Sequence, residues 1–479
     1  MYRSAFAALL APLLLSAPLL AEMPLNQEAS ILRIRELESE TAALRAQLAA
    51  PRPVVRLPSV AGAPSAVAPS STLSAEVVPA SANLPFEAPG PADDQYFTLP
   101  QLQAEMKKLV WKKGDFTITP YGWIWGAAAY ETSRSQTGDF TFYVFSAQDQ
   151  GESAFHVNAK GTRLGLDIAG PRLPFCGCPE TGGKVEIDFE GQFLQENKPG
   201  VLLRHAYWEA KNEDYRLLFG QTWDVISPLY PNSLMYSIYW GAGNIGYRRA
   251  QIRGERYLAA NDRFLLTLQG SLNVDIVSEF PSGASTGFQG DHSAWPVLEG
   301  RTAITLGPRG KGCNPITLGL SGHIGEQVFD FTAAPADDDV YVQTWSCNLD
   351  LKAPVTDRFG FQGELFFGEN LGAYLGGILQ GVNVATREGI YSQGGWFEVY
   401  YYWTPKLHTH VGYTVDDPLD SDLTLATARR FNQAYWGNIC CDVTPKLLVG
   451  IEVSQWKTLF VDRLPGESTR IDFLTRYSF

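Results

Sequence analysis

The chain has 479 residues, of which 19% are charged and 12% aromatic, and its formal net charge is −13. Beyond the first twenty-odd residues it holds no uncharged apolar run near the roughly 18 residues that a membrane helix needs, which argues against a helical membrane protein. The negative charge gives no support for a nucleic-acid partner. Two classes remain: a large soluble β-protein, or an outer-membrane β-barrel, whose alternating apolar and polar residues cancel in an average hydropathy.

The N-terminus has the features of a secretory signal peptide over residues 1–21. Arg3 supplies the positive charge, residues 5–20 form a short apolar stretch that two prolines interrupt, and Ala21 offers a small residue for cleavage. A membrane anchor is the alternative, but the apolar run is short and broken. We therefore expect an exported protein.

Residues 22–50 are predicted to form a coiled-coil segment. Apolar or small residues recur there at alternating spacings of three and four: Ile34, Leu37, Thr41, Leu44 and Leu48. An isolated helix of this length is marginal in water, so we expect it to associate with copies of itself. A single amphipathic helix packed on a domain is the alternative.

Two further segments separate this helix from the rest of the chain. Residues 51–97 are rich in Pro, Ala, Ser and Val, a composition typical of an extended linker. Residues 98–114 are predicted to form one more short helix, which ends at Gly114.

From residue 115 to residue 479, apolar and polar residues alternate with period two. In the segment 185–193, for example, every second residue is apolar or Gly. About sixteen such segments follow one another, longer than ordinary soluble strands, and their connections alternate between short turns and long loops. A soluble sandwich also alternates, but gives no reason for alternating loop lengths. The pattern predicts an all-β fold, a transmembrane antiparallel barrel of about sixteen strands.

Two positions in this pattern give information beyond the strand count. In the segment 153–169 the apolar parity switches near Gly161, which predicts a bulge or a strand end there. At the other end, Phe479 closes a strand in which Tyr477 and Phe473 alternate with polar residues. This terminus resembles the signal that the bacterial barrel-assembly machinery reads.

The connection between the fifth and sixth predicted strands, residues 223–244, is unusually apolar for a loop. It is therefore predicted to fold into the lumen as a constriction loop, with a surface or subunit-contact loop as the alternative. Its candidate residues are Trp223, Asp224, Tyr230, Tyr236, Tyr239 and Trp240.

The sixth predicted strand carries the clearest charge pattern. One of its faces holds Arg249, Gln251, Arg253 and Glu255, and the other holds Ala250, Ile252 and Gly254, with Arg248 and Arg256 near the ends. The arginine-bearing face is predicted to line the lumen, where Arg binds carboxylates through a planar fork and rings of Arg select anions. The alternative is a set of salt bridges with acidic residues of another wall strand, namely Glu186, Asp188 and Glu190.

Other chemistry-bearing residues give weaker signals. The six cysteines lack zinc-ligand spacing, and one or two loop disulfides are the expectation. His408 and His410 share a strand face and could bind a metal, but without a third ligand they are expected to be plain lumen residues. The acidic loops at 337–339 and 416–417 lack the ligand spacing of a calcium site and are expected to be solvated. Neither a nucleophile elbow nor a zinc-protease motif occurs. We predict no enzyme activity, metal or cofactor.

Several segments of the chain resemble the DcaP-type trimeric porins of double-membraned bacteria. They are the residues 203–209 (LRHAYWE), 219–224 (FGQTWD) and 249–253 (RAQIR), and the closing strand to Phe479. The resemblance implies a sixteen-stranded homotrimer in the outer membrane, a periplasmic coiled coil, and an Arg-bearing constriction that passes small anionic solutes such as dicarboxylates. It extends the pore assignment to Arg204. The cysteines and the long linker depart from the family pattern.

The function predicted from the sequence is a passive porin. Its expected partners are outer-membrane lipid, two further copies of the chain, small anions, and the assembly machinery during biogenesis. The alternatives are a structural barrel that tethers the envelope through the coiled coil and linker, and a barrel hydrolase.

Overall fold

The computed structural model describes residues 110–149, 151–191, 200–276, 290–309, 313–330 and 339–479. The predicted signal peptide, coiled coil and linker lie outside the described residues. No helix within these ranges is long and apolar enough to span a bilayer.

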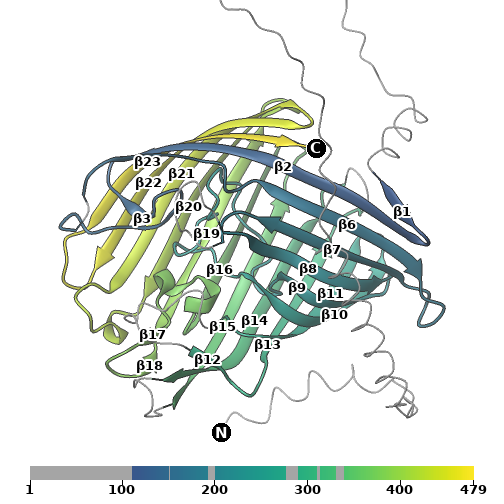
Figure 1. The fold of residues 1–479 in the computed structure, drawn as a ribbon, viewed down its shortest axis with the longest axis horizontal. Helices are drawn as coiled ribbons and strands as arrows, with labels where there is room; N and C mark the ends of the chain where they lie inside the picture. Colours follow the sequence, from purple (N-terminus) through teal and green to yellow (C-terminus); the bar gives the residue numbers. More distant parts are fainter. Residues whose placement is uncertain (1–109, 150, 192–199, 277–289, 310–312, 331–338) are drawn as a thin grey trace, which may run out of the picture. The chain divides into compact units, whose positions relative to one another are not determined.

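Sixteen strands form one closed antiparallel barrel. Their arrangement around the wall can be followed in Figure 1. Each strand pairs with its neighbour in chain order, and the pairing of the first with the last closes the ring. The prediction of an all-β barrel of about sixteen strands is therefore confirmed. The wall strands are β2 (Phe116–Glu131), β6 (Arg163–Arg172), β7 (Glu180–Asp188), β8 (Leu202–Lys211), β9 (Tyr215–Trp223), β10 (Arg248–Asn261), β11 (Phe264–Asn273), β13 (Val297–Leu306), β14 (Ile316–Asp330), β15 (Asp339–Pro354), β16 (Phe359–Glu369), β19 (Tyr391–Tyr402), β20 (Leu407–Pro418), β21 (Arg429–Thr444), β22 (Leu447–Phe460) and β23 (Gly466–Ser478).

The second wall position is filled by two short strands in sequence. β5 (Ala154–Asn158) and β6 both pair with β2, and residues 159–162 between them form no strand. The interruption predicted near Gly161 is therefore confirmed. β2 is continuous opposite this gap, and pairs with β6 before it and with β5 after it.

The prediction of a short helix over 98–114 is wrong for residues 111–113, which lie in the described part of the chain. Trp111–Lys113 form a strand, β1, which pairs with the beginning of β2. β23 pairs with β2 only from Trp123 onward, so the first residues of β2 have a free edge on that side. β1 covers this edge, whose unpaired N–H and C=O groups would otherwise stay exposed.

The two faces of the wall differ sharply. Ile252, Leu365 and Ile451 point outward and are about half exposed, whereas Arg253 and Glu452 point inward and are buried. An apolar outer belt around a polar interior is the pattern of a membrane-spanning barrel. The alternation read from the sequence thus separates a lipid-facing side from a lumen side.

The connections divide the barrel into two ends. Short turns close one end, here called the turn end, as in residues 212–214, 355–358 and 445–446. Long connections lie at the other, the loop end. They are 132–153 with β3 (Ser135–Thr137) and β4 (Thr141–Val144), 224–247, 370–390 with η2 (Gly372–Tyr374), η3 (Gly377–Leu379), β17 (Val382–Asn383) and β18 (Glu388–Gly389), and 419–428 with η4 (Asp420–Asp422). The described part of the β11–β13 connection, residues 274–276 and 290–296, contains β12 (Gly290–His292).

Three long connections fold inward and share an apolar core with the inner wall. They are the β2–β5 loop (132–153), the β9–β10 loop (224–247) and the β16–β19 loop (370–390). Tyr239 illustrates the packing, because its ring stacks on Trp436 of β21 at 5.5 Å and on Trp456 of β22 at 5.3 Å between centroids. Large aromatic rings buried in this way hold the loops against the wall.

The C-terminal residue lies at the closing seam. The backbone N–H of Phe479 donates to the carbonyl of Gly122 in β2 at 3.0 Å. The side chains of Tyr477 and Phe473 point outward and are about half exposed. The strand thus presents alternate aromatic residues to the lipid side.

The expectation of loop disulfides is wrong, because all six cysteines lie in the described residues and none is bonded to another. Cys176, Cys178 and Cys313 lie in turns, Cys347 lies in β15, and Cys440 and Cys441 lie in β21. Adjacent residues of a strand point to opposite faces, which keeps the last two thiols apart.

Candidate functional site

The β9–β10 loop is held against the inner wall by four buried glutamates from four strands, here called the glutamate row. Each carboxylate accepts one backbone N–H of the loop, which pairs donors that have no strand partner. The bonds are Val225 to Glu299 of β13 (2.7 Å), Leu229 to Glu364 of β16 (2.7 Å), Asn232 to Glu398 of β19 (2.7 Å) and Leu234 to Glu452 of β22 (2.9 Å).

The glutamate row was not predicted from the sequence. Its members stand at inward positions of well-predicted strands, so their parity was available as a signal. The alternation does not show which groups these glutamates bind, because the loop and the four strands are far apart in the chain.

Gly243 sets how closely this loop approaches the wall. A Cβ at this position would lie 2.2 Å from the carbonyl oxygen of Gly395 in β19 and 2.6 Å from that of Val415 in β20. The residue also has a φ of +120°, which side chains rarely adopt. Only glycine therefore allows the observed contact.

We expect Gly243→Ala to displace this part of the loop and to lower the stability of the barrel by about 1–3 kcal/mol, the usual cost of overpacking. Gly254→Ala is the matched control, because a Cβ there would meet its nearest atom, in Leu217, at an ordinary 3.9 Å. The midpoint of thermal unfolding in detergent, followed by gel mobility, measures both. Equal midpoints for the two variants would contradict the packing described.

Arg249 lies on the inner face of β10, as the alternation predicted, and is fully buried. Its Nε lies 2.8 Å from Asp224, its Nη1 3.4 Å from Asp275, and its Nη2 donates to the carbonyl of Ala373 at 3.2 Å. Burial raises the pKa of Asp224 to about 7, while Arg249 opposes that rise. This arginine joins β10, the β9–β10 loop and the β16–β19 loop.

Arg249→Leu is expected to destabilise the protein by about 3–5 kcal/mol, because it leaves buried carboxylates without their cation. Arg430→Leu removes an arginine whose ion pair with Asp420 is largely exposed, and is expected to cost at most about 1 kcal/mol. Urea unfolding in detergent, followed by tryptophan fluorescence, compares the two. A small effect of Arg249→Leu would show that the buried cluster does not hold the loops.

The other members of the predicted arginine face also point inward and bind one another. Arg253 donates to Gln251 at 2.7 Å, lies 3.5 Å from Glu255, and donates to the backbone carbonyl of Trp223. Glu255 also lies 3.2 Å from Arg216 of β9. Its charge is therefore compensated within the wall.

Arg204 is likewise paired, with two of the acidic residues singled out from the sequence. Its Nε donates to Glu186 at 2.8 Å and its Nη1 to Asp188 at 2.7 Å. Tyr236 of the β9–β10 loop donates its hydroxyl to Asp188 at 2.8 Å, and burial raises the pKa of Tyr236 well above its usual range. Glu186 and Asp188 therefore form salt bridges, as the alternative expected. Their partner, however, is Arg204, and not Arg249 or Arg253.

Glu190 differs from the prediction. β7 ends at Asp188, so Glu190 lies beyond the strand, where its carboxylate is 3.6 Å from Lys160. The chain turns away from the wall at this point, and strand parity no longer sets the direction of the side chain.

Arg248 was expected on the outer face of β10, and this is wrong. It is 2% exposed and lies among the aromatic residues of the lumen, 4.5 Å from the ring centroid of Trp223, 4.4 Å from that of Tyr247 and 5.8 Å from that of Trp240. Arg248 is the first residue of β10, so the incoming β9–β10 loop sets the direction of its side chain, and the strand alternation does not. Its three guanidinium nitrogens have no hydrogen-bond acceptor among the described residues.

The remaining aromatic candidates surround this arginine or the nearby wall. Trp223 stacks on Tyr230, with ring centroids 6.2 Å apart, and approaches Trp240 at 6.0 Å. Tyr230 is about half exposed, and Trp240 is buried. Tyr236 approaches Trp240 at 6.4 Å, so four of the loop aromatics form one connected group, whereas Tyr239 packs separately on β21 and β22.

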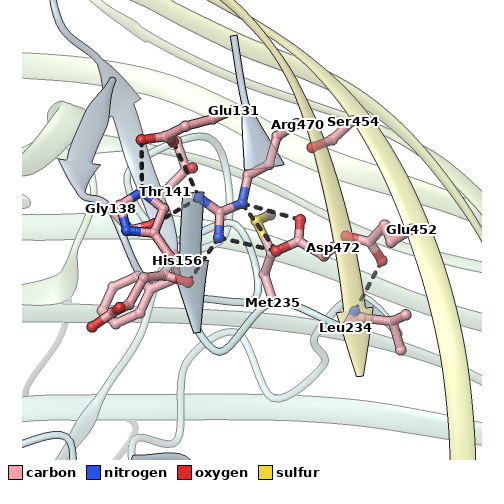
Figure 2. Close-up of polar contacts among 12 residues, drawn as sticks. Glu131, Gly138, Thr141, His156, Leu234, Met235, Glu452, Ser454, Arg470 and Asp472 are labelled. Carbon is pink, nitrogen blue, oxygen red and sulfur yellow. Dashed lines mark hydrogen bonds and ion pairs between the residues drawn. The ribbon is translucent and has the colours of Figure 1, made fainter. Parts of the chain in front are cut away.

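The β2–β5 loop is held against the wall by Arg470 of β23, as Figure 2 shows. Arg470 of β23 is fully buried and donates to the carbonyls of Gly138 and Asp139, both at 2.7 Å. It also pairs with Glu131 at 3.2 Å and Asp472 at 3.0 Å. This loop is therefore bound to the closing seam of the barrel.

The acidic run at 416–417 was expected to be a solvated loop, and this is wrong. Asp416 lies within β20, is buried, and accepts the backbone N–H of Ile378 in η3 at 3.0 Å. It holds the β16–β19 loop as the glutamate row holds the β9–β10 loop. Residues 337 and 338 of the other run lie outside the described residues. In the described ranges, no group of three His, Cys, Asp or Glu side chains is placed to hold a metal ion.

Comparison with known proteins matches this geometry to solved barrels. The chain is similar to the outer-membrane channel DcaP of Acinetobacter baumannii, with a TM-score of 0.61 and 21% identity over 77% of this chain and 99% of that one. The fold is that of a DcaP-type channel. Less similar structures include OmpF of Salmonella typhi (TM-score 0.49, 10% identity, 77% and 100% covered) and an anion-selective porin of Comamonas acidovorans (TM-score 0.47, 12% identity, 76% and 100% covered).

No family model and no curated protein matches the chain. The DcaP-type fold confirms the sixteen-stranded barrel expected from the resemblance. At this level of identity the likeness concerns the fold, so the roles of individual residues follow from the contacts described above.

Proposed function

We propose that the protein is an outer-membrane porin, a passive water-filled channel for small hydrophilic solutes. A closed sixteen-stranded barrel is wide enough for an aqueous lumen, its inner wall is charged, and inward loops narrow it from the loop end. The single observation that supports this function best is the β9–β10 loop, which crosses the inner faces of four wall strands and reduces the lumen without detaching from the wall.

The route for water is proposed to follow the wall formed by β6, β7 and β9. Inward-facing charged residues there keep a substantial exposed fraction: 54% for Asp167, 28% for Lys184 and 22% for Arg216. On β22 and β23, by contrast, Glu452 and Arg470 are fully covered by the inner loops. The inner loops therefore cover these residues of β22 and β23, whereas solvent reaches the inner face of β6, β7 and β9 at Asp167, Lys184 and Arg216.

A preference for anions is proposed to come from Arg248. Its charge has no carboxylate partner within the described part of the chain, whereas Arg204, Arg249 and Arg253 are compensated by acidic residues of the protein. Aromatic ring faces stabilise the guanidinium without neutralising it. An uncompensated cation beside the narrowed lumen attracts anions and repels cations.

The proposed assembly is a homotrimer with the N-terminal coiled coil in the periplasm, and the aromatic C-terminal strand is proposed as the assembly signal. Planar-bilayer recording tests the channel function. Stepwise ion currents from the purified protein support it, and a protein that carries no current would fit the tethering alternative. Lipase and protease assays test the hydrolase alternative.

A further inference from the structure

A groove of about 560 Å³ lies on the outer side of the barrel, between the wall and the end of the β11–β13 connection. Outward-facing residues of β9, β10 and β11 form one side of it, and residues 293–296 of the connection form the other. Its volume is within the range of roughly 300–1,000 Å³ that is typical of small-molecule sites. We call this space the outer groove; its apolar lining residues include Phe219, Ala250, Ile252, Leu272, Val274 and Trp295.

A small residue between larger neighbours creates the recess in the wall. Ile252 of β10 lies directly opposite Phe219 of β9 and Leu272 of β11, so three large side chains form one row across the wall. Two positions closer to the loop end, the same face of β10 carries only Ala250, whose carbonyl accepts the N–H of Val274 at 3.0 Å. The wall is therefore recessed at Ala250 relative to the row beside it.

The outer groove belongs to the lipid-facing side of the barrel. Phe219, Ile252 and Val274 are each about half exposed, whereas Gln251 and Arg253 of β10 point into the lumen and are buried. The outer surface of a membrane-spanning barrel is in contact with the hydrocarbon of the bilayer. The medium that reaches the groove is therefore lipid.

Trp295 closes the groove toward the loop end. Its side chain is 77% exposed, and Ser293 fixes the backbone there by donating to the carbonyl of Trp295 at 2.8 Å and accepting its N–H at 3.3 Å. On β9, the outward position after Phe219 is the polar Gln221, which lies opposite Ala250. Tryptophan side chains concentrate where acyl chains meet polar headgroups. The groove therefore lies at the boundary between the apolar belt and water.

The residues that line the groove decide between candidate occupants. In the described part of the chain none of them is Lys or Arg, so the groove offers no cation to the phosphates of a lipopolysaccharide. Their one charged member is Asp275, an acid that lies 3.4 Å from Arg249. A second barrel presents a convex wall, which does not enter the space between Trp295 and the strands. A single acyl chain is narrow, flexible and apolar, and it meets both conditions.

We propose that the outer groove binds one acyl chain of a phospholipid from the membrane leaflet at the loop end, with Trp295 packed on the chain near the headgroup. The chain fills the recess at Ala250 and contacts the row of large side chains across β9, β10 and β11. It thereby connects residues 293–296 to the wall. Because β10 carries Arg249 and Arg253 on its opposite face, the bound lipid stabilises the arginine-bearing part of the wall from outside.

Native mass spectrometry of the protein reconstituted with palmitoyl-oleoyl phosphatidylethanolamine tests this proposal. The wild type is expected to retain about one lipid per chain at collision energies that remove the others. Ala250→Phe fills the recess and Trp295→Ala opens the groove, and both are expected to weaken retention roughly tenfold, the effect of losing the burial of about two methylene groups. Both side chains are exposed, so the changes leave the packed interior intact. Gel mobility with and without heating confirms that each barrel is closed.

Trp403→Ala is the matched control, because Trp403 is 57% exposed at the turn end, where its indole N–H donates to Thr409 at 2.9 Å. It should retain lipid as the wild type does. Unchanged retention in both groove variants, or an equal loss in Trp403→Ala, would overturn the proposal. So would groove variants that lose only added lipopolysaccharide, or that change the oligomeric mass and keep the lipid. The measurement needs no ion current, so its outcome is independent of the proposed channel function.

Discussion

Replacing Arg248 with Gln is expected to remove most of the anion preference of the channel. Gln keeps polar atoms and much of the length of the side chain, but not its charge, so the aromatic group of Trp223, Tyr247 and Trp240 loses the cation it surrounds. The ratio of chloride to potassium permeability, from the reversal potential in a salt gradient, should fall to one or below. The negative net charge of the chain favours cations once Arg248 is neutral.

Two variants separate charge from shape. Arg248→Lys retains a cation that aromatic faces also bind, and should keep part of the preference. Arg256→Gln removes an arginine from the same strand whose guanidinium donates to the backbone of Asp214 near the turn end, and should change little. An Arg248→Gln channel with normal conductance and unaltered selectivity would show that the anion preference has another source.

Glu452→Ala is expected to release part of the constriction loop and to raise the single-channel conductance. The carboxylate accepts bonds from Ser233 at 2.7 Å, from the backbone of Leu234 at 2.9 Å and from the hydroxyl of Tyr239 at 3.1 Å. Each buried group left without an acceptor costs about 1–3 kcal/mol. Recordings should show larger and noisier currents than the wild type.

Glu467→Ala is the control for this variant, because Glu467 lies on the neighbouring strand in an exposed ion pair with Lys457. Its conductance and thermal stability should match those of the wild type. If Glu452→Ala also matches the wild type, the glutamate row does not hold the loop.

The strands could be predicted from the sequence because lipid and water impose opposite demands on successive residues. Ile252 and Arg253 illustrate this, since adjacent positions of one strand have opposite faces and opposite chemistry. The interruption in the second wall position was also predicted, since the apolar parity changes there. The ends of some strands differ from the prediction: Glu190 lies beyond β7, and Asp416 lies within β20.

The contacts between the inner loops and the wall could not be predicted in the same way. Period-two alternation says that Glu299, Glu364, Glu398 and Glu452 point inward, but not that one loop connects them. Arg248 was misplaced for a related reason, because at the start of a strand the direction of a side chain is set by the incoming loop. These contacts depend on segments far apart in the chain, which meet only in the closed barrel.

The reversal potential of the wild-type channel in a potassium chloride gradient tests the central claim most directly. An open channel governed by Arg248 should give a potential of the sign set by chloride, even though the chain as a whole is acidic. A potential of the opposite sign, or a reconstituted protein that carries no current, would contradict an anion-preferring porin.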